Sequence, residues 1–332
     1  MPRVFSTAGL PADRRVELWE SHNATALIGL LVHAPGMLDA SELNIALPQV
    51  RLARVVGSSH AVERTPGVIS RFPADSVAVY LTLRGDAWFS SAEGTLARHP
   101  GDAVICETDS PFARRFARGL EELVVTVPRS ALTARADVGR LTGPVIASFA
   151  VPPTTAGRRA GSGGTGGPDQ YARALARIAG RATRPGHSLL PAEQTVLDLV
   201  AVLAAGPRAA RGAAHRAVAH SYIEEHLTDP GLGADEIAAA TGISERQLSR
   251  LFSADCTSVP RHILSRRLEL AHSILSSQAA AATRAPKSLT RPQTVAEIAA
   301  RCGFTSATYF SHAFRQHFNH RASDLHRIPA AG

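Results

Sequence analysis

The sequence predicts an α+β protein of two domains: an amino-terminal β-barrel with a helical connector, then a carboxy-terminal all-α domain. Three observations support this fold class. Short apolar runs alternate with turn formers up to about residue 130, a glycine-rich stretch near residue 160 cannot pack into a core, and helical periodicity dominates residues 215–328. We therefore expect domains at residues 1–150 and 213–332, joined by a flexible linker and connector helices at residues 151–212.

The composition is that of a folded protein with a basic surface. Of the 332 residues, 45% are hydrophobic and 19% are charged, so disorder of the whole chain is excluded. The formal net charge of +8 favours a polyanionic partner such as nucleic acid. Because both parts of the chain share this excess, it does not locate the binding surface.

The cysteines and the apolar runs indicate the cellular compartment of the protein. Cys106, Cys256 and Cys302 are far apart and form no CxxC pair, which argues against a disulfide framework or a zinc site and favours a reducing compartment. No apolar run has the length of a membrane span, and the first residues carry no apolar signal core. We expect a cytoplasmic protein without a membrane partner.

The amino-terminal region predicts one helix and a series of strands. Residues 11–24 fit a short helix with Leu18 and Trp19 on one side. Turn formers such as Gly85-Asp86 separate apolar or alternating runs, which predict a sandwich or a barrel. Their inward side chains are mainly aliphatic, so we expect a closed barrel around an apolar pocket. The predicted strands are residues 26–33, 50–56, 76–83, 87–90, 103–107 and 120–127.

The connector contains two predicted helices. Residues 152–168 read as a linker, and helical spacing of apolar residues follows, from Tyr171 to Ile178 and again from Val196 to Leu203. The apolar faces of residues 171–203 either complete a core or form a dimer interface, and the sequence leaves both open. Residues 206–212 are a second break, and residues 276–294 predict a mobile insertion.

Residues 233–252 have the pattern of a helix-turn-helix. Gly242 supplies a tight turn, Ser244 caps a second helix, and Gln247 at its third position completes a capping-box pattern. Such a second helix can lay polar side chains on base edges in the DNA major groove, although a plain helical hairpin would show the same spacing. The side chains expected to point outward are Glu245, Arg246, Ser249 and Arg250.

Residues 295–318 repeat this pattern. Gly303 takes the place of Gly242, and Thr305 or Ser306 caps the following helix. Between the two motifs, residues 261–275 form an amphipathic helix that can hold both on one DNA face, about 34 Å apart. The tandem arrangement makes a chance match of either motif improbable. The outward side chains of the second motif are Thr308, Ser311, His312 and Arg315.

At these residues the chain resembles the AraC/XylS family of bacterial transcription regulators. The resemblance covers residues 216–327 and rests on IAARCGF, on the register of Tyr309-Phe310 with Ala313-Phe314, and on LSRLF followed by Arg266-Arg267. The family implies a seven-helix DNA-binding domain with two helix-turn-helix units. Upstream, residues 85–112 followed by VPRSAL resemble the family's cupin-like sensor domain.

The resemblance implies a set of DNA-contacting residues but no catalytic ones. Ligand-binding residues cannot be assigned from the sequence. The predicted DNA-contacting residues are Ser244, Glu245, Arg246, Gln247, Ser249, Arg250, Arg266, Ser306, Ala307, Thr308, Ser311, His312 and Arg315.

The chain departs from the family pattern at several positions. Cys256 stands where a glycine usually follows the first motif, and His312 stands where an arginine is often found. In the tail, Asn319, Ala322 and Leu325 replace a glycine, a proline and an aromatic residue. We expect a less rigid second motif with a lower DNA affinity.

Metal and enzyme chemistry find little support in the sequence. The spacing of His312, His317 and His320 does not stack on one helical face, and residues 26–130 contain no HxH motif of the kind that cupin enzymes use. We expect no metal and no cofactor. Cys106 is most simply a small buried hydrophobe.

These observations predict a sequence-specific transcription regulator, an activator by the family's usual mode, that is not an enzyme and is controlled by a small organic effector in the barrel. Its expected partners are operator DNA and RNA polymerase, and a second copy bound through residues 171–203 is left open as a further partner. One alternative is a cupin-like enzyme fused to a DNA-binding domain. Another is a constitutive, nucleoid-type DNA binder without an effector.

Overall fold

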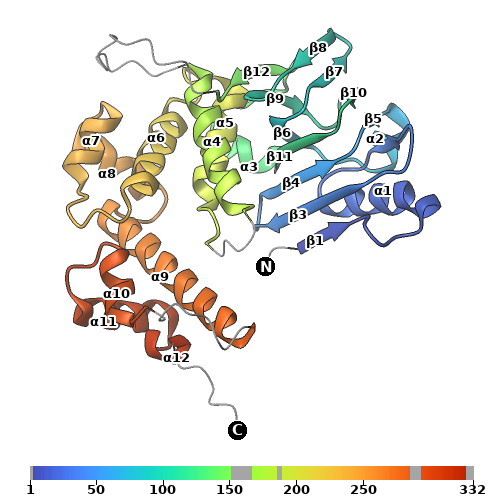
Figure 1. Cartoon of the computed structure of the whole chain (residues 1–332). Coiled ribbons are helices and arrows are strands. Elements are labelled where there is room, and N and C mark those ends of the chain that lie inside the picture. Colours follow the sequence, from blue (N-terminus) through green and yellow to red (C-terminus); the bar gives the residue numbers. More distant parts are fainter. Residues whose placement is uncertain (1–2, 151–166, 185–188, 285–292, 327–332) are drawn as a thin grey trace, which may run out of the picture. The chain divides into compact units, whose positions relative to one another are not determined.

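The computed structural model describes residues 3–150, 167–184, 189–284 and 293–326. The chain divides into two compact units (Figure 1). The amino-terminal unit comprises Met1–Arg184 and Pro191–Ala217, and the carboxy-terminal unit comprises Pro185–Leu190 and Val218–Gly332. The predicted linker at residues 152–168 and the end of the predicted insertion lie mostly outside the described residues. The α+β fold class with two domains is confirmed.

The amino-terminal unit contains two antiparallel sheets (Figure 1). The larger has seven strands in the order β1 (Arg3–Ser6), β3 (Ala40–Ala46), β4 (Arg51–Gly57), β11 (Leu120–Pro128), β6 (Ser76–Arg84), β9 (Asp102–Glu107) and β12 (Val145–Ser148). The smaller has five strands in the order β2 (Leu31–His33), β5 (His60–Arg64), β10 (Phe112–Phe116), β7 (Ala87–Ser91) and β8 (Gly94–Arg98).

The expected closed barrel is wrong. Among the described residues, no hydrogen-bonded strand pair joins the seven-stranded sheet to the five-stranded one. Alternation of apolar and polar residues reports only which strand face is buried, and a sandwich and a barrel bury the same faces. The two sheets therefore face each other as separate layers.

Both faces of the larger sheet are covered. Val55, Tyr80 and Val124 belong to the core shared with the smaller sheet and with α1 (Arg15–Ala26). Leu123 and Arg54 lie on the opposite face, where the Arg54 guanidinium donates a hydrogen bond to the Gly180 carbonyl of helix α4 at 3.2 Å. Burial on both faces explains why β6 is apolar almost throughout, with seven successive buried residues.

Most of the elements predicted for this unit are present, and the structure adds strands that were not predicted. Five of the six predicted strands are found, but residues 26–33 form a strand only at β2 because α1 continues to Ala26. The helix predicted at residues 11–24 is present, as the short 3-10 turn Ala12–Arg14 followed directly by α1. Pro66-Gly67 begins the helix α2 (Pro66–Arg71), capped by Thr65, and α3 (Arg129–Thr133) follows β11. Strands β1, β3, β5, β8, β10 and β12 were not predicted.

The two predicted connector helices pack within the amino-terminal unit. They are α4 (Pro168–Ala182) and α5 (Glu193–Ala205). Tyr171, Leu175 and the whole stretch of α5 from Thr195 to Ala204 are buried. The apolar faces of residues 171–203 thus serve a core, and a dimer interface through them stays a prediction. None of the helices in the described part of the chain has the length and apolar character that a membrane crossing requires.

The described part of the carboxy-terminal unit contains seven helices, counting α6, which begins in the other unit. They are α6 (Arg211–His226), α7 (Ala234–Thr241), α8 (Glu245–Ala254), α9 (Val259–Arg284), α10 (Val295–Arg301), α11 (Ala307–Phe318) and α12 (Ala322–His326). Helix α9 runs to Arg284, so residues 276–284 are helical rather than part of a mobile insertion. Residues 285–292 lie outside the described residues.

Two positions that lack the family's glycine adopt the backbone that a glycine would. Cys256 has a φ of 55° and Asn319 a φ of 59°, both in the left-handed region. This conformation costs most L-residues about 1–2 kcal/mol, whereas asparagine tolerates it. The backbone at Cys256 is therefore strained, and the backbone at Asn319 is less strained.

We expect Cys256→Gly to raise the free energy of unfolding of the carboxy-terminal unit by up to about 1 kcal/mol, after the larger entropy of glycine in the unfolded chain is subtracted. Asn319→Gly is the matched control and should change it by less than half as much. Urea unfolding followed by helical circular dichroism measures both. A loss of stability in Cys256→Gly would show that the thiol makes a contact worth more than the strain.

Candidate nucleic-acid interface and sensor cavity

The first helix-turn-helix is formed by α7 and α8. Gly242 takes a φ of 68° between the helices, and the Ser244 hydroxyl accepts a hydrogen bond from the Gln247 amide at 3.2 Å. Leu248 and Phe252 are fully buried in a core that also includes Ile237. The predicted turn and cap are therefore present, and burial of one face fixes which residues of α8 reach solvent.

The second helix-turn-helix, α10 and α11, has stronger caps. Thr294 and Glu297 form a reciprocal capping box at the start of α10. Of the two predicted caps of α11, it is Ser306 whose hydroxyl accepts the Tyr309 amide, at 3.2 Å. Gly303 has a φ of 83° and approaches the Thr228 carbonyl so closely that a side chain there would crowd it.

Both recognition helices present polar side chains to solvent. Among the described residues, no acidic side chain forms an ion pair with Arg246, Arg250 or Arg315. These guanidinium groups are therefore available to an anion. The predicted DNA-contacting residues that are exposed are Ser244, Glu245, Arg246, Gln247, Ser249, Arg250, Ser306, Ala307, Thr308, Ser311, His312 and Arg315.

Arg266 differs from the other predicted DNA-contacting residues because it is only 4% exposed. Its Nε lies 2.5 Å from the Glu224 carboxylate of α6, and its other nitrogens bind Glu269 and the Leu190 carbonyl. Burial lowers the pKa of Arg266, but the two carboxylates outweigh it and raise the pKa. With its donors used inside the unit, Arg266 cannot reach a phosphate, and we leave it out of the proposed DNA surface.

Arg267 is also used internally. Its Nε donates to the Leu227 carbonyl at 2.9 Å, and its Nη2 donates to the Asp229 carbonyl. These two carbonyls lie beyond the end of α6, so Arg267 ties α9 to the loop that leads into α7. The pair Arg266-Arg267 thus joins helices rather than contacting DNA.

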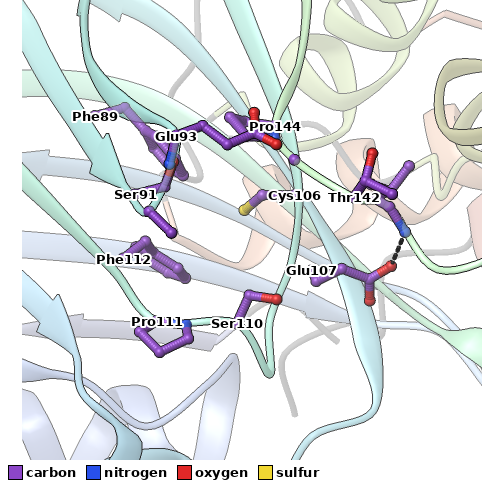
Figure 2. Close-up of a pocket in the computed structure, with 13 residues that line it drawn as sticks. Phe89, Ser91, Glu93, Cys106, Glu107, Ser110, Pro111, Phe112, Thr142 and Pro144 are labelled. Carbon is purple, nitrogen blue, oxygen red and sulfur yellow. Dashed lines mark hydrogen bonds between the residues drawn. The ribbon is translucent and has the colours of Figure 1, made fainter.

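The amino-terminal unit contains a cavity of about 180 Å³ between its two sheets (Figure 2). Phe89 of β7 and Phe112 of β10 supply aromatic walls, with ring centroids 5.5 Å apart, and Cys106 of β9 faces the same space. Residues 141–144, which precede β12, close one side. The sequence assigned no residue to a ligand site. Of the residues that line this cavity, it singled out only Cys106, which it predicted to be buried, and Cys106 is buried.

A second space between the sheets is too small for an organic ligand. It has a volume of about 30 Å³, enough for one water molecule, and borders the ion pair of Arg114 and Glu122. The guanidinium of Arg114 donates to Glu122 at 2.9 Å and lies over the Tyr80 ring, 3.8 Å from its centroid. Burial lowers the pKa of Arg114, but Glu122 outweighs this effect and raises it. This pair is structural.

An ionic link joins the cavity loop to helix α6 within the amino-terminal unit. Asp198 of α5 is fully buried and accepts two hydrogen bonds from Arg216 of α6, at 2.8 and 2.9 Å. Arg135, at the start of the loop that leads to residues 141–144, has its Nη1 3.8 Å from the same carboxylate. Helix α6 then continues into the carboxy-terminal unit.

Metal chemistry gains no candidate from the structure. Within the described residues, no group of three or more His, Cys, Asp or Glu side chains is arranged to hold a metal ion. His312, His317 and His320 belong to α11 and the turn after it, where His317 and His320 contact the Phe318 ring.

Comparisons with known proteins agree with the geometry. Residues 287–319 match the family model described as bacterial regulatory helix-turn-helix proteins, AraC family. The transcriptional activator RhrA of Rhizobium meliloti (strain 1021) is 30% identical over 109 residues, which are 33% of this chain and 31% of that protein. The transcriptional activator NphR of a Rhodococcus species is 25% identical over 276 residues, covering 81% of this chain and 75% of that protein.

Among solved structures, the AraC-like transcriptional activator CuxR is 19% identical, with a TM-score of 0.44, and the match covers 81% of this chain and 94% of that one. The matched family model identifies an AraC-type helix-turn-helix of DNA-binding transcription regulators at residues 287–319, as the resemblance to the AraC family implied. This family is one of regulators rather than a class of enzymes.

The burial of Arg266 generates a prediction. We expect Arg266→Met to lower the free energy of unfolding of the carboxy-terminal unit by about 3–5 kcal/mol, because Glu224 and Glu269 would lose their buried counter-charge. Arg250→Met, on the exposed face of α8, should change it by less than about 0.5 kcal/mol. Urea unfolding of both variants measures this. The role in stability would be contradicted if Arg266→Met kept full stability and flattened the salt dependence of DNA binding by about one unit.

Proposed function

We propose that the protein is a sequence-specific transcription activator whose DNA binding is controlled by a small organic effector bound in the amino-terminal unit. The observation that carries the DNA-binding part is the pair of capped helix-turn-helix motifs packed on the one helix α9. Activation is proposed because RhrA and NphR are both described as transcriptional activators. An activator of this kind would contact RNA polymerase when bound at a promoter.

Base reading is assigned to the exposed faces of α8 and α11. A guanidinium can bond O6 and N7 of guanine bidentately, which is worth about 1–3 kcal/mol of discrimination. Arg246 and Arg250 in α8 and Arg315 in α11 have the exposure that this requires. Ser244, Ser306 and Thr308 lie at the helix amino termini or in the first turn, where hydroxyl and amide groups suit phosphate contacts.

Effector control is supported by the cavity and by the ionic link. A molecule bound in the cavity would touch residues 141–144, and Arg135 of the same loop lies beside Asp198, which holds Arg216 of α6. A ligand shifts an equilibrium only if it binds one state better than another. The proposed two states differ in how this loop and α6 are held, and α6 leads directly into the DNA-binding unit.

Arg246 offers a direct test of base reading. The operator is first defined by sequencing the fragments of a random DNA pool that the purified protein retains. We expect Arg246→Ala to relax the preference at one base pair by about 1–3 kcal/mol and to leave the other positions unchanged. Arg261→Ala, exposed at the start of α9, is the control and should leave every base preference in place. A uniform loss of affinity over all operator variants would show that Arg246 contacts only phosphate.

A further inference from the structure

The size of the cavity limits its occupant. An apolar cavity of about 150 Å³ accommodates benzene, whereas pockets for drug-sized ligands measure about 300–1,000 Å³. The cavity of about 180 Å³ therefore holds one six-membered ring with one small substituent. A nucleotide or an oligosaccharide is too large for it.

The walls of the cavity suit a flat apolar ring. The Phe89 and Phe112 rings are nearly parallel, with 20° between their planes, and both residues are buried. Burial raises the pKa of the Cys106 thiol to about 12, so this sulfur stays neutral and is a soft, polarizable contact. Leu141 and Pro144 add further apolar surface on the loop side.

The two charged residues that line the cavity are both acidic. None of the 13 lining residues is basic, while Glu93 and Glu107 both line it. The oxygens of Glu107 are occupied, one by the Leu141 amide at 2.7 Å and the other by Arg129. Glu93 (labelled in Figure 2) stands at the turn between β7 and β8, and its carboxylate lies against Gly143. No basic side chain in the described residues pairs with Glu93. The cavity therefore offers an acceptor and repels an anion.

We propose that this cavity binds a single-ring organic molecule that carries a hydrogen-bond donor and no negative charge, and that this molecule is the effector. The ring lies against Phe89 and Phe112, and the donor points to Glu93. The effector role rests on the proposed function, while the binding itself does not.

Three probes of nearly equal size test the charge preference on the full-length protein: benzyl alcohol, benzylamine and benzoate. Calorimetric titration should show that benzyl alcohol binds at least about tenfold more tightly than benzoate. Benzylamine should bind about two- to fivefold more tightly than benzyl alcohol because of Glu93, which is exposed and therefore partly screened. Benzoate binding as tightly as the other two, or no binding by any of the three, would overturn the inference.

Variants locate the binding. Glu93→Gln should remove the advantage of benzylamine over benzyl alcohol, and it carries little risk to folding because Glu93 is exposed. Glu63→Gln, the same change at a half-buried position of β5 outside the cavity lining, should keep that advantage. Ser110→Leu, at the exposed loop after β9, should fill the cavity and weaken all binding more than tenfold. Unchanged binding in both Glu93→Gln and Ser110→Leu would place the probes elsewhere.

The same titrations separate this inference from the proposed function. If the probes bind in the predicted order but leave operator affinity unchanged, the proposed binding site and its charge preference are confirmed, and the effector role is wrong. If operator affinity responds to benzoate and Ser110→Leu does not alter the response, effector control stands and the cavity is not its site.

Discussion

Helix α9 is the element on which the geometry of the DNA-binding unit depends. Val259 and Ile263 at its start belong to the core of the first helix-turn-helix, and Leu268, Ala271 and Leu275 belong to the core of the second. Its 26 residues span about 39 Å, which is comparable to one turn of DNA, about 34 Å. Because one helix serves both cores, α8 and α11 cannot rotate independently. The buried ion pairs of Arg266 fix α9 against α6 between these cores.

Much of the carboxy-terminal unit could be predicted because its signals are local. A cap, a tight turn and the spacing of apolar residues lie within a few positions of one another, and Ser244, Gly242 and Ser306 adopt the expected roles. The burial and ion pairing of Arg266 could not be predicted from such local signals. Its main partner, Glu224, is 42 positions away, and only the packing of α6 against α9 brings the two together.

The amino-terminal unit was harder to predict because it buries charged side chains. Strands β5 and β10 contain Arg64 and Arg114, which are 0% and 5% exposed, so neither strand shows a simple apolar alternation. Arg64 is satisfied by the Gly29 and Phe72 carbonyls and by Asp109, groups that come from separate loops. The same holds for the cavity, because its lining comes from two sheets and a loop that are distant in sequence.

The central claim of this account is that ligand binding in one unit and operator binding in the other are thermodynamically linked. The most direct test is to titrate benzyl alcohol into the full-length protein with and without operator DNA, and to titrate the DNA with and without benzyl alcohol. Linkage requires that the two affinity ratios be equal, and we predict a common factor of at least about five. A factor of one in both titrations, with benzyl alcohol bound, would contradict effector control.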